Sequence, residues 1–369
     1  MRNLMAGILL FCGAAAYVAR GAEVTTFYVA ATNVVDGTHF KTVTAALDAV
    51  QKKSPGTCVV RLASGVYREK IVVSTACRGL KIVAEERGKA VISWDDYAAK
   101  SGPGGAELGT FRSYTMCVDA DDFEMDGVTV VNTASDADVE AGGRGVGQAV
   151  ALHVSGDRCL FRNCTIKSYQ DTLYLTQEQF IDSSIRRFVD SEGEAKDKRR
   201  VSRQYFERCR IEGACDFIFG HSTALFNDCD LYLRQRGYVT AAATPKEQPF
   251  GFVFVNCRIT GKRGEKPSML GRPWREFAQT VFVDCEMDES IAPEGWRTWR
   301  PGDGRDRTAY YADFGTTGKG ANNAKRVSWS HTDEADKESY FSTRGVNDIL
   351  ADMLKGTDGW SLESELAAN

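Results

Sequence analysis

Short stretches in which hydrophobic and polar residues alternate recur along the chain, and this period of two predicts β-strands. In the N-terminal third of the chain, such stretches predict strands at 26–30, 58–62, 70–73 and 80–84. Spacing typical of a helix is found at 42–52, where Val43, Leu47 and Val50 form one apolar face, and again at 346–354. The pattern therefore predicts many short strands, with one amphipathic helix towards each end.

The middle of the chain repeats a pattern of Phe, a small or polar residue three positions later, and an aliphatic residue five positions later. The repeat begins at Phe123, Phe161, Phe206, Phe226, Phe254 and Phe282, with starts 38, 45, 20, 28 and 28 residues apart. In five of the six copies the small residue is cysteine, namely Cys164, Cys209, Cys229, Cys257 and Cys285. Such a period fits one coil of a solenoid plus loops of different length. We therefore predict an all-β fold, a single-stranded parallel β-helix in which like residues stack.

A solenoid exposes its core at each end, so both amphipathic segments are expected to act as caps. We expect the helix at 42–52 to cover one end and the segment 346–354 to cover the other. Loops are expected at 132–147, 176–203 and 299–307. The charged part of the second loop is interpreted as a solvated excursion, because the repeat resumes directly at Phe206.

The cysteines of the repeat are interpreted as stacked structural thiols. A metal site is disfavoured, because the chain has no CxxC pair and only 4 histidines. Two alternatives stay open outside the cytoplasm, namely one or two disulfides within the ladder and a disulfide between Cys58 and Cys77.

The N-terminus predicts export. Arg2 precedes an apolar run at 4–18, and cleavage is expected after Ala16 or Gly21. A membrane anchor is disfavoured because a span needs about 20 apolar residues, and a lipid-modified Cys12 is a further alternative. We expect a signal peptide at 1–21 and one catalytic domain at 22–369, secreted or periplasmic and including the cell surface. The net charge of −4 shows no nucleic-acid footprint, and we expect a monomer without a membrane span.

Four short runs combine polar residues with strand-like surroundings, at 147–152, 169–174, 215–220 and 270–274. In a stacked solenoid, positions distant in the sequence become neighbours on adjacent coils. One face could therefore collect Gln148, Gln170, Asp171, Asp216 and Arg272.

These residue types suit acid–base and nucleophilic chemistry. Asp216 precedes Phe-Ile-Phe, so we expect it to be partly desolvated, with Arg272 as the partner that lowers its pKa. Asp171 has no cation in its own run, so we expect a raised pKa. Two carboxyl groups with separated pKa values suit one nucleophile or base and one acid, and two amides can stabilise an oxyanion.

Each of these residues also has a structural interpretation. Asp216 and Arg272 could be a buried structural pair, the two glutamines a polar ladder, Trp274 a core residue, and Asp171 part of a turn. No histidine lies in a nucleophile motif, which disfavours Ser-His-Asp catalysis.

Through these four runs, the chain resembles the pectin methylesterase (pectinesterase) family over about residues 25 to 360. Weaker matches lie at 40–43, 65–70, 238–241, 293–296 and 310–311. The resemblance implies a right-handed parallel β-helix that hydrolyses the methyl esters of galacturonate units in pectin (homogalacturonan). It implies no metal and no cofactor.

The resemblance also implies a role for each candidate residue. Asp216 is the expected nucleophile, and Asp171 the expected acid and then base. Gln148 and Gln170 are expected to stabilise the oxyanion, and Arg272 to orient Asp216. Gln148 and Arg272 are also expected to contact the substrate, together with Thr110, Tyr174, Phe219, Trp274 and Trp296.

The chain departs from the family pattern in two places. The connection from Leu175 to Tyr205 is longer than usual, and Cys215 stands where a small residue is common. The alternative functions are another polysaccharide-active β-helix enzyme (a lyase or a glycosidase) and a non-catalytic carbohydrate-binding solenoid. A lyase would need a calcium-binding carboxylate cluster, and none is evident. A glycosidase would need two paired acids without the amides.

Overall fold

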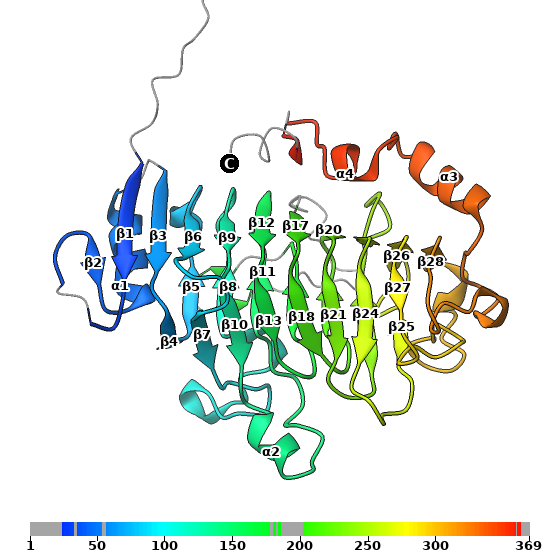
Figure 1. Cartoon of the computed structure of the whole chain (residues 1–369), viewed down its shortest axis with the longest axis horizontal. Coiled ribbons are helices and arrows are strands. Elements are labelled where there is room, and N and C mark those ends of the chain that lie inside the picture. The colour runs from blue at the N-terminus through cyan, green and yellow to red at the C-terminus, as the bar shows by residue number, and fades with distance from the viewer. Residues whose placement is uncertain are drawn as a thin grey trace, which may run out of the picture.

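The strands of this computed structural model form three parallel sheets that run along the molecule (Figure 1). The structure describes residues 24–32, 35–53, 57–177, 180–181, 184–185, 202–358 and 360–362. The expected signal peptide and most of the loop 176–203 lie outside the described residues. Between residues 58 and 287 the chain passes through the three sheets in turn, and the structure is therefore the predicted parallel β-helix.

In the described part of the chain, the three sheets A, B and C contain the following strands. Sheet A has 11 strands: β2 (His39–Phe40), β1 (Thr25–Val29), β3 (Cys58–Leu62), β6 (Lys81–Ala84), β9 (Glu124–Asp126), β12 (Cys159–Arg162), β17 (Arg203–Glu207), β20 (Thr223–Asn227), β23 (Phe252–Val255), β26 (Gln279–Val283) and β28 (Tyr310–Phe314). Sheet B has 8: β27 (Glu286–Met287), β24 (Arg258–Gly261), β21 (Asp230–Leu233), β18 (Arg210–Gly213), β13 (Thr165–Lys167), β10 (Thr129–Asn132), β7 (Ala90–Trp94) and β4 (Gly65–Arg68). Sheet C has 7: β25 (Met269–Gly271), β22 (Tyr238–Ala242), β19 (Ile218–Gly220), β14 (Leu173–Leu175), β11 (Leu152–Val154), β8 (Met116–Val118) and β5 (Ile71–Val73).

The remaining elements are short. An antiparallel pair, β15 (Phe180–Ile181) and β16 (Ser184–Ile185), belongs to the loop after β14. The α-helices are α1 (Val43–Lys53), α2 (Asp136–Glu140), α3 (Glu334–Ser342) and α4 (Ile349–Asp352). The 3₁₀ turns are η1 (Thr75–Cys77), η2 (Pro103–Gly105), η3 (Thr110–Arg112), η4 (Arg305–Arg307) and η5 (Asn323–Lys325). Among the described residues, no helix combines the length and apolar character that a membrane crossing requires.

A column of phenylalanine rings fills the core behind sheet A. Its members occupy one register position on successive strands, namely Phe161, Phe206, Phe226, Phe254 and Phe282. Successive ring centroids are 4.4–4.7 Å apart, and the ring planes differ by only 8–12°. The spacing matches the distance between neighbouring strands, so the predicted ladder is confirmed for these five residues.

The first predicted copy of the repeat is out of register. The residue paired with Phe161 on the preceding coil is Met125, whereas Phe123 lies two positions earlier. Both side chains are buried, because a shift of two residues keeps a strand side chain on the same face. The hydrophobic pattern alone therefore could not distinguish the two registers.

The cysteines three positions after the phenylalanines form a second ladder. Each Sγ lies 3.2–3.5 Å from the carbonyl oxygen two residues earlier. It also lies 3.4–3.6 Å from a carbonyl oxygen of the preceding coil. A small residue with one weak donor therefore has two backbone acceptors within reach in a tight interior.

The described cysteines are all free thiols, including Cys58 and Cys77. The structure thus agrees with the interpretation as structural thiols and contains none of the disulfides that the sequence left open. Burial raises the pKa of Cys77 to about 11, which keeps this thiol protonated and unreactive near neutral pH.

Helix α1 closes the N-terminal end of the β-helix as expected. Its buried face packs against the first coils and carries Val43, Ala46, Leu47 and Val50. The Glu69 carboxylate accepts hydrogen bonds from the backbone N–H groups of Val43 (2.8 Å) and Thr44 (2.9 Å). This acceptor satisfies two of the free donors at the helix N-terminus and complements the helix dipole.

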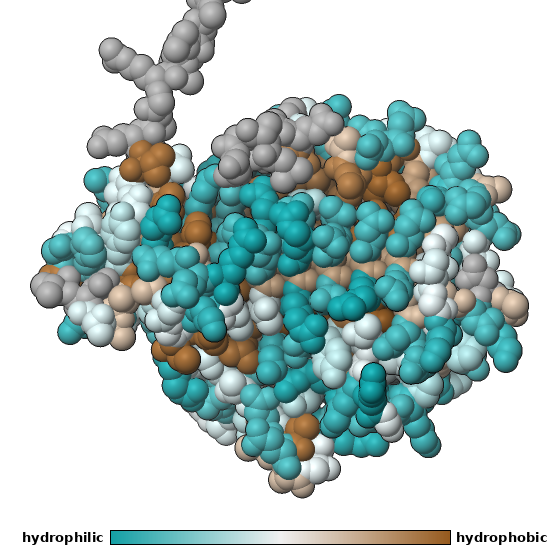
Figure 2. Space-filling model, in the orientation of Figure 1, coloured by the Kyte–Doolittle hydropathy of each residue, from teal (hydrophilic) through white to brown (hydrophobic). Residues whose placement is uncertain are grey.

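The expectation that segment 346–354 covers the other end is wrong. In Figure 1 the C-terminal segment with α3 and α4 runs back across the strands of sheet A, from the side of β28 towards the middle of the sheet. It buries the outer face of that sheet, with Val346, Met353 and Leu354 in the same apolar cluster as Leu160, Tyr205, Leu225, Val253 and Val281. Figure 2 shows hydrophobic residues gathered around α4, while most of the remaining visible face is hydrophilic.

Charged residues hold this segment in place. The Arg203 guanidinium lies 2.7 Å from the Asp157 carboxylate and 2.6 Å from that of Asp358. Arg203 also donates a hydrogen bond to the carbonyl oxygen of Leu354. The side chain of Arg203 is buried, so these hydrogen bonds are what makes the buried charge tolerable.

We expect Phe226→Ala to lower the free energy of unfolding by about 3–5 kcal/mol, because the ring is fully buried between two others. Urea denaturation measures this change. The matched control is Val66→Ala, whose side chain is 72% exposed, with an expected change within about 0.5 kcal/mol. A loss below about 1 kcal/mol for the Phe226 variant would contradict the packed ladder.

Candidate active site

Four of the predicted site residues, Gln148, Gln170, Asp171 and Asp216, lie just before strands of sheet C, and Arg272 directly follows β25. Gln148 and Gln170 form an isolated parallel bridge. The pairing of Leu173 with Ile218 places Asp171 and Asp216, each two residues earlier, at equivalent positions of neighbouring coils. Strands in a sheet are about 4.8 Å apart, so the carboxyl groups originate from adjacent points. The predicted collection of polar residues on one face is therefore what the register produces.

Both aspartates adopt a left-handed backbone conformation, with φ of 61° at Asp171 and 51° at Asp216. This region is uncommon outside glycine, although Asp and Asn occupy it more readily than most residues. The Asp171 N–H donates a 3.0 Å hydrogen bond to the Cys215 carbonyl oxygen, which fixes one bend against the next. Asp171 is therefore both part of a turn and a candidate site residue, because the turn orients its carboxyl group.

Arg272 holds Asp216 in a two-point contact. Its Nε donates to Oδ1 over 2.9 Å and its Nη2 to Oδ2 over 2.5 Å. The Asp216 side chain is 7% exposed and that of Arg272 is 20% exposed. A bidentate guanidinium fixes the carboxylate plane as well as its charge. The predicted pairing of these two residues is therefore present in the structure.

Two aromatic rings hold the guanidinium of Arg272, and neither ring was expected in the site from the sequence. The Tyr238 ring centroid lies 4.1 Å from Cζ and that of Trp299 lies 4.2 Å away. Tyr238 begins the strand between the coils of Asp216 and Arg272, so the guanidinium crosses it to reach Asp216. The weak motif match at 238–241 was the only signal for Tyr238, and Trp299 was identified only as the start of a loop.

The two carboxyl groups differ in electrostatic environment. Burial, reinforced by the charge of Asp216, raises the pKa of Asp171 well above its ordinary value. Burial also raises the pKa of Asp216, but the hydrogen bonds and charge of Arg272 oppose this rise. Asp216 therefore ionises first, and Asp171 keeps its proton while its neighbour is charged. Among the described residues, Asp171 forms no salt bridge of its own.

Cys215 lies against the same guanidinium, with its Sγ 3.6 Å from Arg272 Nη2. Burial and the Asp216 charge raise the pKa of the Cys215 thiol to about 12. The thiol is therefore a neutral neighbour at ordinary pH. The thiol adds a further contact to the Asp216–Arg272 pair without adding charge.

Aromatic side chains line the outer face of sheet C next to the aspartates. Tyr174 and Phe219 are paired in register, and their ring centroids are 4.7 Å apart. They are 1% and 4% exposed, so they support the surface from beneath. Trp274 is partly exposed and lies over Phe219 at 6.0 Å. Of these three expected sugar contacts, only Trp274 presents a sizeable part of its ring to solvent.

Of the remaining expected substrate contacts, Thr110 lies near the site and Trp296 lies in the core. Thr110 begins η3, and the adjacent Phe111 contacts both Tyr174 and Trp274, so Thr110 lies at the edge of the aromatic cluster. The expectation for Trp296 is wrong. Its ring is 1% exposed and packs in the core between Phe282 and Tyr311, out of reach of a bound sugar.

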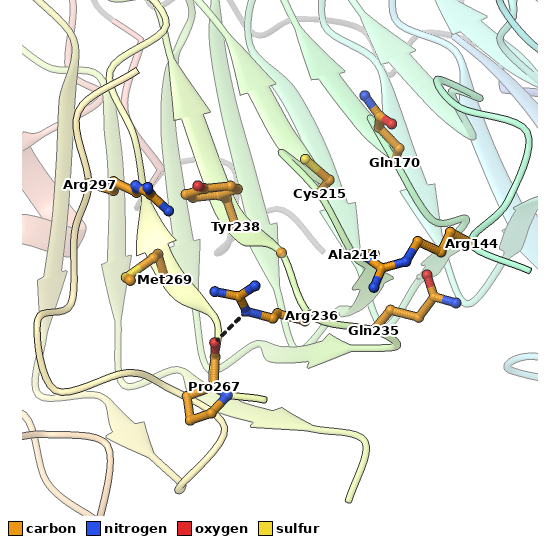
Figure 3. Close-up of a pocket in the computed structure, with 11 residues that line it drawn as sticks. Arg144, Gln170, Ala214, Cys215, Gln235, Arg236, Tyr238, Pro267, Met269 and Arg297 are labelled. Carbon is orange, nitrogen blue, oxygen red and sulfur yellow. Dashed lines mark hydrogen bonds between the residues drawn. The ribbon is translucent and has the colours of Figure 1, made fainter. Parts of the chain in front are cut away.

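A cavity of about 270 Å³ opens beside the catalytic candidates. Gln170 and Cys215, which directly precede Asp171 and Asp216 in the chain, line it together with Tyr238 (Figure 3). Within the part of the chain that the structure describes, no three His, Cys, Asp or Glu side chains are grouped to hold a metal ion.

Known proteins match this chain in sequence and in fold. The family model described as Pectinesterase matches residues 29–191 and 199–349. Pectinesterase QRT1 of Arabidopsis thaliana is 32% identical over 308 residues, which cover 82% of this chain and 73% of that protein.

Solved structures give the same result. The pectin methylesterase from carrot superposes with a TM-score of 0.69 at 29% identity, covering 85% of this chain and 91% of the carrot chain. A pectin methylesterase in complex with a hexasaccharide gives a TM-score of 0.67 at 27% identity, covering 89% and 98% of the two chains. On this evidence, the chain belongs to the pectinesterase family.

Proposed function

We propose that this protein hydrolyses the methyl esters of galacturonate units in pectin, releasing methanol and leaving free carboxylates. The observation that carries the proposal is the pairing of two unlike carboxyl groups on adjacent coils. Asp216 is held ionised by the two hydrogen bonds from Arg272, while burial and that charge keep Asp171 protonated. An ionised nucleophile beside a neutral acid is what ester cleavage requires.

In the first half of the reaction, an Asp216 carboxylate oxygen attacks the ester carbonyl carbon. The carbonyl oxygen becomes an oxyanion, which the side-chain amides of Gln148 and Gln170 stabilise as neutral donors. Asp171 donates its proton to the methoxy oxygen as the carbon–oxygen bond breaks, and methanol leaves. The galacturonate acyl group is then joined to Asp216 as an anhydride.

In the second half, the ionised Asp171 takes a proton from a water molecule. The water oxygen attacks the acyl carbon, and the bond to Asp216 breaks. Asp216 leaves as a carboxylate, which Arg272 stabilises, and Asp171 has regained its proton. All steps use side chains of this chain, without a metal or a cofactor.

Trp274 and Thr110 are the proposed sugar contacts at the surface of the site, with Tyr174 and Phe219 supporting them from below. An aromatic face suits the apolar side of a sugar ring. We also propose that the protein acts as a monomer outside the cytoplasm, which fits the N-terminal apolar run and the location of pectin in cell walls. The signal peptide at 1–21 and a single domain at 22–369 stay predictions.

Replacing the two aspartates tests the assignment of roles. We expect Asp216→Asn to lower kcat for methanol release from highly methylated pectin by more than about 10³-fold, because the nucleophile is lost. Asp171→Asn should lower it by about 10²–10⁴-fold, because the acid and base is lost.

Asp228→Asn is the matched control, since Asp228 has a similar left-handed conformation (φ 53°) but lies exposed in a turn elsewhere on the β-helix. It should retain full activity. Full activity of the Asp216 variant would exclude Asp216 as the nucleophile. Pectin binding by the wild type without methanol release would instead favour a carbohydrate-binding solenoid.

The raised pKa of Asp171 has a consequence for stability. Its folded-state pKa lies above the unfolded value, so the native state holds a proton that the unfolded state releases. Stability from this group is complete below the unfolded pKa of about 3.9, and is lost as pH rises towards the folded pKa. We expect urea midpoints to show Asp171→Asn gaining stability relative to wild type between pH 4 and pH 7. A difference that does not change with pH would contradict the raised pKa, and Asp228→Asn serves as the control here too.

Chelation of metal ions distinguishes the proposed ester hydrolysis from a lyase reaction. We expect EDTA to leave methanol release unchanged, because the proposed steps need no metal ion. A β-helix lyase would instead lose activity with EDTA and form an unsaturated sugar product that absorbs ultraviolet light. Detection of that product, with its loss on chelation, would overturn the proposed reaction.

A further inference from the structure

The ion pair between Arg272 and Asp216 lasts for only part of the proposed reaction. Two nitrogen atoms of the guanidinium donate to the Asp216 carboxylate before the reaction begins. When Asp216 attacks the ester, its carboxylate becomes part of a neutral anhydride, whereas the arginine keeps its positive charge. The charge that attracts the guanidinium is then lost, and Arg272 needs another attachment if it is to stay at the site.

The two aromatic rings beside Arg272 provide such an attachment. Their centroids lie 4.1 Å (Tyr238) and 4.2 Å (Trp299) from the guanidinium carbon. A cation is attracted to the quadrupole of an aromatic ring, and this attraction does not depend on the charge of Asp216. The Arg272 side chain is only 20% exposed, which strengthens such contacts relative to those on an open surface. Both contacts therefore persist when the ion pair is lost.

The rings come from the coils on either side of Arg272. Tyr238 begins β22, the strand that pairs with β25 immediately before Arg272. On the following coil, Trp296 forms a parallel bridge with Gly271, and Trp299 comes three residues later. The strand register therefore brings one ring from each neighbouring coil to the same guanidinium.

The loop that carries Trp299 is attached to the segment that carries Arg272. Arg305 Nη1 donates hydrogen bonds to the carbonyl oxygens of Pro273 (3.0 Å) and Trp274 (2.6 Å). The Trp299 side chain is partly buried and packs against the aromatic cluster on the outer face of sheet C. The fold thus determines the position of the ring, and the contact with Arg272 is not its only support.

We propose that Tyr238 and Trp299 are positioning residues that keep Arg272 beside Asp216 while the acyl group is attached. The inference rests on the proposed function. In the second half of that reaction, the water oxygen bonds to the acyl carbon, and Asp171 takes the water proton. The bond between the acyl carbon and the Asp216 oxygen breaks, and its electron pair returns to Asp216 as a carboxylate. A guanidinium already in place stabilises this charge as it forms, whereas a displaced one would leave a buried carboxylate unpaired.

The first half of the reaction depends less on the rings, because an ionised Asp216 attracts Arg272 by itself. Loss of a ring should therefore slow hydrolysis of the acyl-enzyme more than its formation. The value of kcat depends on both halves, whereas kcat/KM depends only on the steps up to the release of methanol. We consequently expect kcat and KM to fall together in a variant that lacks one ring.

Rapid-quench measurement of methanol released from highly methylated pectin tests this inference. Trp299→Leu and Tyr238→Leu should each show a burst of about one methanol per enzyme. The steady-state rate that follows should be about tenfold below that of wild type, with kcat/KM within about threefold. Mass spectrometry of the quenched variants should detect the galacturonate chain attached to Asp216. Trp299→Phe and Tyr238→Phe keep a ring and should restore the steady-state rate to within about threefold of wild type.

Two further variants serve as controls. Tyr232→Leu removes another contact between an arginine and a ring, 4.9 Å from Arg210 on sheet B, and should match wild type in both kinetic phases. Trp274→Leu removes a proposed sugar contact and should raise KM without a burst.

Equal losses in kcat and kcat/KM without a burst in the two leucine variants would overturn the positioning role. The same loss in the phenylalanine variants would also overturn it, because the ring would then not be what matters. In either case, methanol release by the wild type leaves the proposed reaction standing. If the wild type itself releases no methanol, the proposed reaction fails and the positioning role fails with it.

Discussion

Backbone hydrogen bonds between consecutive coils keep every strand in register with the next, and both the core and the site depend on this register. Because parallel partners repeat the same position, an inward side chain must fit directly between its equivalents. Phe206 and Phe226 meet this condition by stacking nearly flat. The cysteine ladder meets it with a small side chain whose thiol reaches backbone carbonyl oxygens on two coils. At the last coil the position of the ladder is taken by Asp313, which Arg326 neutralises in the interior.

The same register creates the electrostatic asymmetry of the site. Two aspartates at equivalent positions of neighbouring coils would repel each other if both were ionised. Arg272 arrives two coils beyond Asp216 and neutralises that residue, which leaves Asp171 as the group that stays protonated. The rings of Tyr238 on the intervening coil and of Trp299 from a loop lie against the guanidinium. A carboxyl pair of this kind is costly to bury, and it is tolerated because one member is paired and the other is neutral.

The outer face of sheet A carries an apolar surface that the C-terminal segment covers. Tyr205, Leu225 and Val253 point away from the core on successive strands and would be exposed on an isolated solenoid. The C-terminal segment covers them, and the contacts of Arg203 with Asp157 and Asp358 anchor it. Burial of this apolar row stabilises the fold by removing it from water, while the ion pairs determine where the segment lies.

The sequence alone predicted the fold class and the main candidates for the site. The spacing of Phe and Cys predicted stacked coils, and the resemblance of the four polar runs to a known family identified Asp171, Asp216, Gln148, Gln170 and Arg272. Tertiary structure decided the rest. Phe123 and Met125 both face inward, so only the pairing of strands could select Met125 as the partner of Phe161. The amphipathic pattern of 346–354 showed that one face is buried, but not that sheet A buries it.

Trp296 shows the same limit of sequence-based prediction. The run 293–296 matched the family pattern, but the Trp296 side chain packs into the core. The contacts of Tyr238 and Trp299 with Arg272 join residues from different coils and loops. Sequence spacing predicts which way a side chain points within one coil. Contacts between coils depend on loop lengths and register, which are set only when the whole chain is folded.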